Sequence, residues 1–223
     1  MNKHLSQIDT WLFDLDNTLY PADSGIFQQV HVLMGKFISK RLGLKIEEAK
    51  KIQKEYFRKH GTTLRGLMDN HGIDPDEFLD EVHNLDYSIV KPNPELRNSL
   101  TKLNGKKIIF TNANLAHAEK VLSKLKIKDL FEDIYDIKLA NYIPKPEMEP
   151  YKDVIKKYNV VPRKTVMLDD IAKNLVPASK LGITTVWIDM GYENFSDDIE
   201  NSKKYLNYQI TNLPLWLNSI IKE

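Results

Sequence analysis

The chain has 223 residues, 42% of them apolar, and a formal net charge of +1. This length allows one domain of ordinary size plus an insertion. The balance of 32 basic and 31 acidic residues argues against nucleic acid or an anionic membrane as a partner. Cysteine is absent, which excludes disulfides, thiolate metal sites and cysteine nucleophiles and fits a reducing cytoplasm. No stretch approaches the ~20 apolar residues needed to cross a bilayer.

The first element is a buried strand predicted at 10–15, followed by a long segment of a different kind. Residues 21–93 contain no convincing strand and four helical patterns, at 25–41, 46–59, 62–71 and 75–84. The gap to the next strand is far longer than a normal crossover connection. We therefore expect a small helical cap domain at 21–93, with hinges at Pro21 and at Pro92-Asn93-Pro94.

The rest of the chain alternates short apolar strands with helical stripes. The strands are expected at 107–111, 133–137, 165–168 and 184–188. The helices are expected at 114–125, 147–158, 172–181 and, after an extended segment near 208–210, at 214–221. This alternation predicts an α/β fold with a doubly wound, Rossmann-like parallel sheet. Its core domain would comprise 1–20 and 94–223.

Two aspartates, Asp14 and Asp16, directly follow the apolar run of the first strand. Residues two apart on a strand edge point the same way, so their carboxylates repel unless a cation lies between them. Magnesium meets that need with oxygen ligands and also binds phosphate. One carboxylate could then attack phosphorus while the other moves a proton. The alternative is a pair of surface turn aspartates.

Further polar residues follow the other strands. Thr111 and Asn112 could hold a phosphate oxygen at a helix N-terminus, or could simply cap that helix. Lys145 lies between two prolines that restrict its backbone, and could neutralise charge between a carboxylate and a phosphate or be a solvated loop lysine. Asp169 and Asp170 are adjacent acids at a strand end, which cap a helix or bind a cation.

The order and spacing of these motifs resemble the haloacid dehalogenase-like superfamily of phosphatases. The resemblance covers about 1–20 and 94–191, through Asp-Leu-Asp-Asn-Thr-Leu-Tyr, Phe-Thr-Asn, Lys-Pro and Leu-Asp-Asp. It implies that Asp14 is the nucleophile of an aspartyl-phosphate mechanism and that Asp16 is its general acid and base.

The same resemblance implies the roles of the remaining motif residues. Thr111, with Asn112 beside it, would bind the phosphoryl group, and Lys145 would hold nucleophile and phosphate together. Magnesium would be bound by Asp14, by the backbone carbonyl of Asp16 and by Asp170, with Asp169 close by.

Within that superfamily the chain looks most like the pyrimidine 5′-nucleotidase group. The similarity lies in Asp-Asn-Thr-Leu-Tyr-Pro at 16–21 and in the cap stretch Gly-Thr-Thr-Leu-Arg-Gly-Leu at 61–67. It implies a nucleoside monophosphate as substrate, contacted by Thr63 and Arg65. The alternative for this stretch is an ordinary helix start, with Thr62 or Thr63 as the N-cap.

Two other functions share these motifs. A phosphosugar phosphatase or a phosphoglucomutase-like enzyme would use the same four clusters, and a non-catalytic nucleotide-binding module could keep the fold. A dehalogenase is disfavoured, because that chemistry lacks the second carboxylate that Asp16 supplies. The six histidines lack metal-ligand spacing and are expected to be structural or exposed. The sequence leaves the oligomeric state open.

Overall fold

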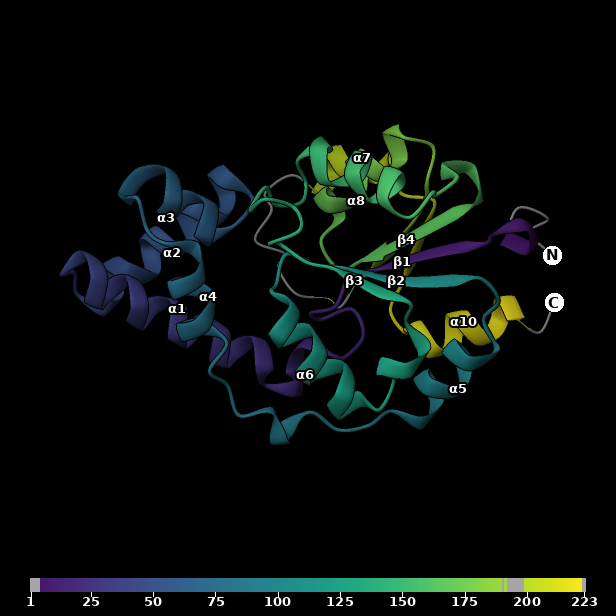
Figure 1. Cartoon of the computed structure of the whole chain (residues 1–223), viewed down its shortest axis with the longest axis horizontal. Helices are drawn as coiled ribbons and strands as arrows, with labels where there is room; N and C mark the ends of the chain where they lie inside the picture. The colour runs from purple at the N-terminus through teal and green to yellow at the C-terminus, as the bar shows by residue number, and fades with distance from the viewer. Residues whose placement is uncertain (1–4, 190, 192–198, 222–223) are drawn as a thin grey trace.

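The computed structural model describes residues 5–189, 191 and 199–221, and its centre is a six-stranded parallel sheet (Figure 1). The strand order is β3-β2-β1-β4-β5-β6. The strands are β1 (Thr10–Phe13), β2 (Lys106–Phe110), β3 (Asp133–Tyr135), β4 (Thr165–Asp169), β5 (Thr184–Ile188) and β6 (Tyr208–Ile210). The order reverses at β1, which is paired with β2 on one side and β4 on the other. Ligands of open α/β sheets bind at such a switch point, outside the carboxyl ends of the strands.

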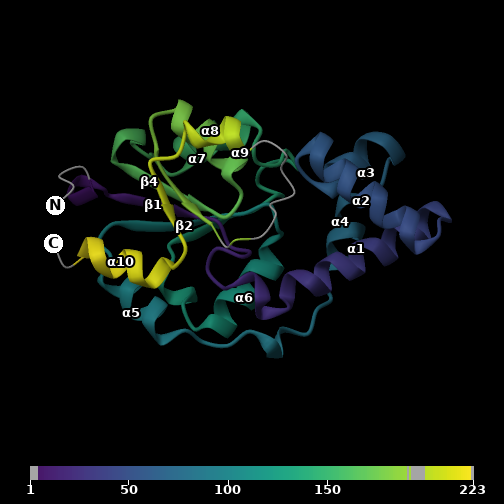
Figure 2. The same ribbon diagram turned by 180° about the vertical axis from the view of Figure 1, so that it is seen from behind.

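Helices cover both faces of this sheet (Figures 1 and 2). One face carries α5 (Pro94–Lys102), α6 (Leu115–Leu125) and α10 (Leu213–Ile221), with α10 packed against α5. The opposite face carries α7 (Met148–Lys157), α8 (Ala172–Lys180) and the short α9 (Ile199–Lys203). The predicted doubly wound α/β fold is therefore confirmed. Helices α5 and α9 were not predicted from the sequence, and Pro177 lies within α8 without ending it.

Alternating side chains of each central strand pack into two separate hydrophobic cores. Trp11 and Phe13 of β1 pack on the side of α5, α6 and α10, whereas Leu12 packs on the side of α7 and α8. Because neighbouring residues of a strand point to opposite faces, a strand buried on both faces is apolar throughout. All four residues of β1 are buried, as this arrangement requires.

The segment between β1 and α5 folds into a separate four-helix cap (Figure 1, left). Its helices are α1 (Ile26–Leu42), α2 (Ile46–His60), α3 (Thr63–His71) and α4 (Pro75–Val82). They enclose a third apolar cluster that includes Phe37, Leu67 and Phe78. The predicted helical insertion after the first strand is thus present, and we propose residues 20/21 and 93/94 as its boundaries. Within the described residues, no helix has both the length and the apolar character of a membrane span.

Candidate active site

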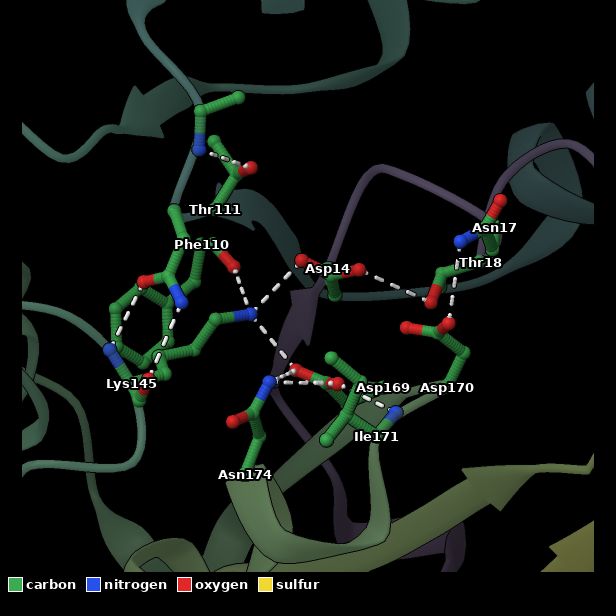
Figure 3. Close-up of polar contacts among 12 residues, drawn as sticks. Asp14, Asn17, Thr18, Phe110, Thr111, Lys145, Asp169, Asp170, Ile171 and Asn174 are labelled. Carbon is green, nitrogen blue, oxygen red and sulfur yellow. Dashed lines mark hydrogen bonds and ion pairs between the residues drawn. The ribbon is translucent and has the colours of Figure 1, made fainter. Parts of the chain in front are cut away.

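Asp14 lies at the switch point of the sheet, one residue after β1. Its backbone N–H donates to the carbonyl of Leu168 in β4 at 2.9 Å, which continues the pairing of the two strands. The side chain is buried and is held at both oxygens: Lys145 Nζ donates to Oδ1 at 2.8 Å and Thr18 Oγ1 donates to Oδ2 at 3.2 Å (Figure 3). The nucleophile candidate is therefore fixed in orientation.

Lys145 is a fully buried cation with three acceptors. Its ammonium group donates to Asp14, to Asp169 Oδ2 at 2.7 Å and to the carbonyl of Phe110 at 2.8 Å, which uses all three of its protons (Figure 3). Asn112 fixes the backbone of this loop, accepting from Lys145 N at 2.8 Å and donating to Lys145 O at 3.2 Å. Burial alone would lower the pKa of Lys145, but the two carboxylates outweigh it and raise that pKa. The lysine is thus a permanent charge.

The adjacent acids at the end of β4 have different surroundings. Asp169 is fully buried and accepts hydrogen bonds from Lys145, from Ile171 N at 2.9 Å and from Asn174 Nδ2. Asp170 faces the cavity and accepts one long hydrogen bond, 3.4 Å, from Asn17 Nδ2. Asp169 is the last residue of β4, whereas Asp170 lies just beyond the strand, in the turn before α8, which explains the difference.

Three carboxylates converge where a cation could bind. Oxygens of Asp14, Asp169 and Asp170 all lie within 4.8 Å of one another. Burial raises the pKa of Asp14 to about 7, although Lys145 opposes the shift. Burial, with the neighbouring Asp14 and Asp169, likewise raises the pKa of Asp170. These three acids share the charge of one lysine, so the site has excess negative charge. An all-oxygen donor set of this charge fits a hard divalent cation.

Asp16 takes no part in that cluster. Its Oδ1 accepts from Tyr20 Oη at 2.5 Å and lies 2.8 Å from Nε2 of His117, a buried residue in the first turn of α6. Burial would raise the pKa of Asp16, but the contacts with His117 and Tyr20 lower it overall. Asp16 also lines the same cavity as Asp14.

A cavity of about 610 Å³ lies between these residues and the cap. Asp14, Asp16, Asn112, Lys145 and Asp170 line its core end. The wall contributed by the cap is mainly aliphatic and aromatic, and includes Phe27, Val30, Met34, Phe57, Phe78 and Val82. Most ligand sites are concave spaces of about 300–1,000 Å³ with apolar walls and a few polar groups.

Three of the residues proposed from the sequence have other contacts. Thr111 is buried outside the cavity lining, and its Oγ1 accepts from Ala113 N at 3.0 Å. Thr63 lines the cavity and donates to the carbonyl of Gln53. Arg65 is not among the lining residues and pairs with Asp69, one turn along α3. Thr62 is the N-cap of this helix, so a substrate contact by Arg65 stays a prediction.

His117 and Tyr20 are the neighbours of Asp16 that the sequence analysis did not single out. From the sequence, all six histidines are expected to be structural or exposed. One local signal was available. His117 is three residues after Asn114, the N-cap of the helix that follows Thr111-Asn112, and its N–H donates to the Asn114 side chain. A residue in that turn lies near the carboxyl ends of the strands.

Several characterised proteins have related sequences. The chain is 32% identical over 136 residues to phosphate metabolism protein 8 of Saccharomyces cerevisiae, covering 56% of this chain and 42% of that protein. It is 28% identical over 146 residues to the glyceraldehyde 3-phosphate phosphatase of Pyrococcus furiosus, covering 63% and 59%. The match to the enzyme of that name from Methanocaldococcus jannaschii is 26% over 216 residues, covering 91% and 92%. The chain thus spans about half the length of the first two relatives.

Solved structures share the fold across nearly the whole chain. A predicted phosphatase from Clostridium acetobutylicum superposes with a TM-score of 0.66 at 16% identity, covering 97% of this chain and 99% of that one. The magnesium-bound HAD-hydrolase YfnB of Bacillus subtilis gives a TM-score of 0.63 at 15% identity, with the same two coverages. The L-2-haloacid dehalogenase of Xanthobacter autotrophicus gives 0.59 at 13%, covering 96% and 98%. At these identities the likeness is one of fold.

A family model gives the assignment. The model of the haloacid dehalogenase-like hydrolases matches residues 8–182, a span that contains the cap and all four motif clusters. The buried Asp14–Lys145 pair and the three converging carboxylates lie within it. This chain belongs to the haloacid dehalogenase-like hydrolase family.

Proposed function

We propose that this protein is a magnesium-dependent phosphate monoester hydrolase that acts through an aspartyl-phosphate on Asp14. The observation that carries the proposal is the joint placement of Asp14 and Asp16 on one cavity, with the buried Lys145 against Asp14. A dehalogenase needs only the first carboxylate, so the second favours phosphoryl transfer. The names of the three related proteins above agree with phosphate ester chemistry.

The chemistry proceeds in two displacements at phosphorus. A carboxylate oxygen of Asp14 forms the new P–O bond while the ester P–O bond breaks, and Asp16 gives its proton to the departing oxygen. Asp16 then takes a proton from water, whose oxygen attacks the aspartyl-phosphate and releases phosphate and free Asp14. Lys145 keeps Asp14 oriented and offsets its charge throughout.

Magnesium is the cation proposed for the carboxylate cluster. Asp14 and Asp170 would bind it, together with the backbone carbonyl of Asp16, while Asp169 is engaged by Lys145 and Asn174. The ion would supply positive charge to the phosphate oxygens and to the crowded acids.

The metal site gives a pH-dependent prediction. An acid with a raised pKa in the folded state binds protons that the unfolded chain does not bind. The metal-free protein therefore loses stability as pH rises from ~4 towards the raised pKa of about 7 of Asp14. At a hundredfold excess over Kd, Mg²⁺ should raise Tm by roughly 5–10 °C at pH 8. The rise in Tm should be smaller at pH 5. Differential scanning fluorimetry measures this. An equal gain at both pH values, or an undiminished gain in Asp170→Asn, would contradict the assignment.

For the substrate we propose a nucleoside monophosphate. The cavity extends from the aspartates to an apolar and aromatic wall in the cap, which fits a flat base better than a small, fully polar sugar phosphate. Gln53 and His31 are polar members of that wall, and their side chains lie 3.0 Å apart. They offer hydrogen bonds for the edge of a base.

Replacing Gln53 with leucine tests this recognition. The variant keeps the volume and loses the amide, so kcat/KM for a nucleoside monophosphate should fall about tenfold, the value of one hydrogen bond. Hydrolysis of p-nitrophenyl phosphate should change little, since an aryl ester makes no such bond. Gln209→Leu, in the remote strand β6, is the matched control. Equal losses on both substrates would reject base recognition.

A phosphosugar phosphatase is the second candidate, because two related proteins are glyceraldehyde 3-phosphate phosphatases. A panel of pyrimidine and purine monophosphates, glyceraldehyde 3-phosphate and hexose phosphates, assayed with and without Mg²⁺, separates the two. Highest kcat/KM on a nucleotide supports the first proposal, and highest kcat/KM on a sugar phosphate supports the second.

A further inference from the structure

His117 is completely buried at the site, yet the two displacements described above do not use it. Its side chain has no exposed surface, and it lies between Asp16 and the segment by which the chain leaves the cap. A buried imidazole is expected to have its ring nitrogens satisfied. Here both nitrogens have a partner, and one partner is the proposed general acid.

The contacts form a continuous chain from the site to the cap. His117 Nε2 lies 2.8 Å from Asp16 Oδ1, and His117 Nδ1 lies 3.0 Å from the hydroxyl of Tyr87. Tyr87 belongs to the 3₁₀ turn Tyr87–Ile89 between α4 and α5, and its hydroxyl is also 3.1 Å from the carbonyl oxygen of His83. The imidazole of His83 stacks on that of His117 with ring centroids 4.4 Å apart.

The proton inventory fixes the orientation of the ring. Oδ1 of Asp16 accepts whether Oδ2 is ionised or carries the proton for the leaving group, so Nε2 of His117 carries a proton and donates to Oδ1. Nδ1 lies within hydrogen-bond distance of the Tyr87 hydroxyl, which itself donates to the carbonyl of His83. Each nitrogen therefore has one polar partner, and rotation of the ring would break both contacts.

Two hydrogen bonds fix the same oxygen of Asp16. Tyr20, on the segment that enters the cap, donates to Oδ1, as does His117. Within the described residues, no hydrogen bond to Asp16 Oδ2 is formed. His117 and Tyr20 thus leave Oδ2 as the oxygen that can meet a substrate in the cavity.

We propose that His117 is a positioning residue: it holds Asp16 so that Oδ2 reaches the leaving-group oxygen, and Tyr87 holds His117. This inference rests on the proposed function, because it assumes that Asp16 protonates the leaving group. Proton transfer needs donor and acceptor within hydrogen-bond reach, so a freely rotating Asp16 would lose most of its effect.

The test is the dependence of kcat/KM on the leaving group, because kcat/KM covers the steps up to leaving-group release. For a series of aryl and alkyl phosphates, log kcat/KM is plotted against the pKa of the leaving group. The slope is shallow where the enzyme supplies a proton and steep where it does not. His117→Leu should lose about 100-fold on an alkyl phosphate and no more than about threefold on 2,4-dinitrophenyl phosphate, which needs no acid. Asp16→Asn, which has no acid at this position, gives the steepest slope expected.

Two milder variants keep the test decisive if His117→Leu folds poorly. His117→Gln places an amide N–H near the position of Nε2 and should recover most of the native slope. Tyr87→Phe removes only the hydroxyl that holds Nδ1, and should steepen the slope less than His117→Leu does. His71→Leu, on an exposed position of α3, is the control and should keep the native slope.

Each outcome decides between a positioning role and a structural one. Equal losses on all esters, with the slope unchanged in His117→Leu and in Tyr87→Phe, would overturn the proposal and leave His117 as a packing residue. A native slope in Asp16→Asn would remove the assumed acid and the proposal with it. Failure of the proposed function is visible separately, as native activity in Asp14→Asn.

Discussion

Asp14→Asn is expected to reduce hydrolysis of an aryl phosphate by at least about 10⁴-fold, because the amide cannot form the acyl phosphate. The fold should persist. Lys145 keeps Asp169 and the carbonyl of Phe110 as acceptors, and asparagine matches the volume of aspartate. Steady-state kinetics at saturating Mg²⁺ measure the first effect, and circular dichroism measures the second.

The stability of this variant carries a second expectation. Since burial raises the pKa of Asp14, its ionised form destabilises the metal-free folded state at pH 8. Asp14→Asn should therefore be at least as stable as the native protein without Mg²⁺, and should gain less from adding it. Asp23→Asn, an exposed aspartate in the turn after Tyr20, should match the native protein in both assays. Activity within tenfold of native in Asp14→Asn would end the proposed mechanism.

Lys145→Met is expected to cost about 3–5 kcal/mol of unfolding free energy at pH 8, the usual result of removing one partner of a buried ion pair. The substitution leaves Asp14 and Asp169 facing each other without a cation between them. The loss of unfolding free energy should shrink towards pH 5, because protonation of Asp14 removes that repulsion. Urea unfolding in the absence of divalent cations gives both values.

An exposed lysine supplies the matched comparison. Lys128 pairs with Glu119 at 2.8 Å, but its side chain is 51% exposed. Lys128→Met should therefore change stability by no more than about 1 kcal/mol. Similar losses in the two variants would show that Lys145 contributes no more than a surface pair. A Lys145→Met protein that folds at pH 5 and not at pH 8 would support the repulsion argument.

Local patterns in the sequence predicted most of the fold. Apolar runs and helical stripes depend on near neighbours in the chain, so five strands and the four cap helices were expected within two residues of most of their observed ends. Helix α5 departs from the sequence expectation, since Pro94, expected in a hinge, is the first residue of this helix. Proline is common at the first position of a helix, so Pro94 fits a helix start as well as a hinge.

The sequence indicates some contacts of the site but not others. Asp14 and Asp170 follow adjacent strands, and the carboxyl ends of adjacent parallel strands meet, so their proximity could be expected from order alone. The direction in which the Arg65 side chain points could not be expected from the sequence, because it depends on how α3 packs and on the competing acceptor Asp69. A cap residue reaches a substrate only through the placement of the cap helices relative to the sheet.

The sequence by itself determined the alternation of strands and helices, the helical insertion and the polar residues at the strand ends, because each is set by neighbours along the chain. The tertiary structure alone decided which acid meets which base. His117 is 101 positions from Asp16, and the neighbouring Asp169 and Asp170 have different partners, Lys145 and Asn17. Such contacts depend on helix docking and side-chain direction, and these are settled only when the core packs.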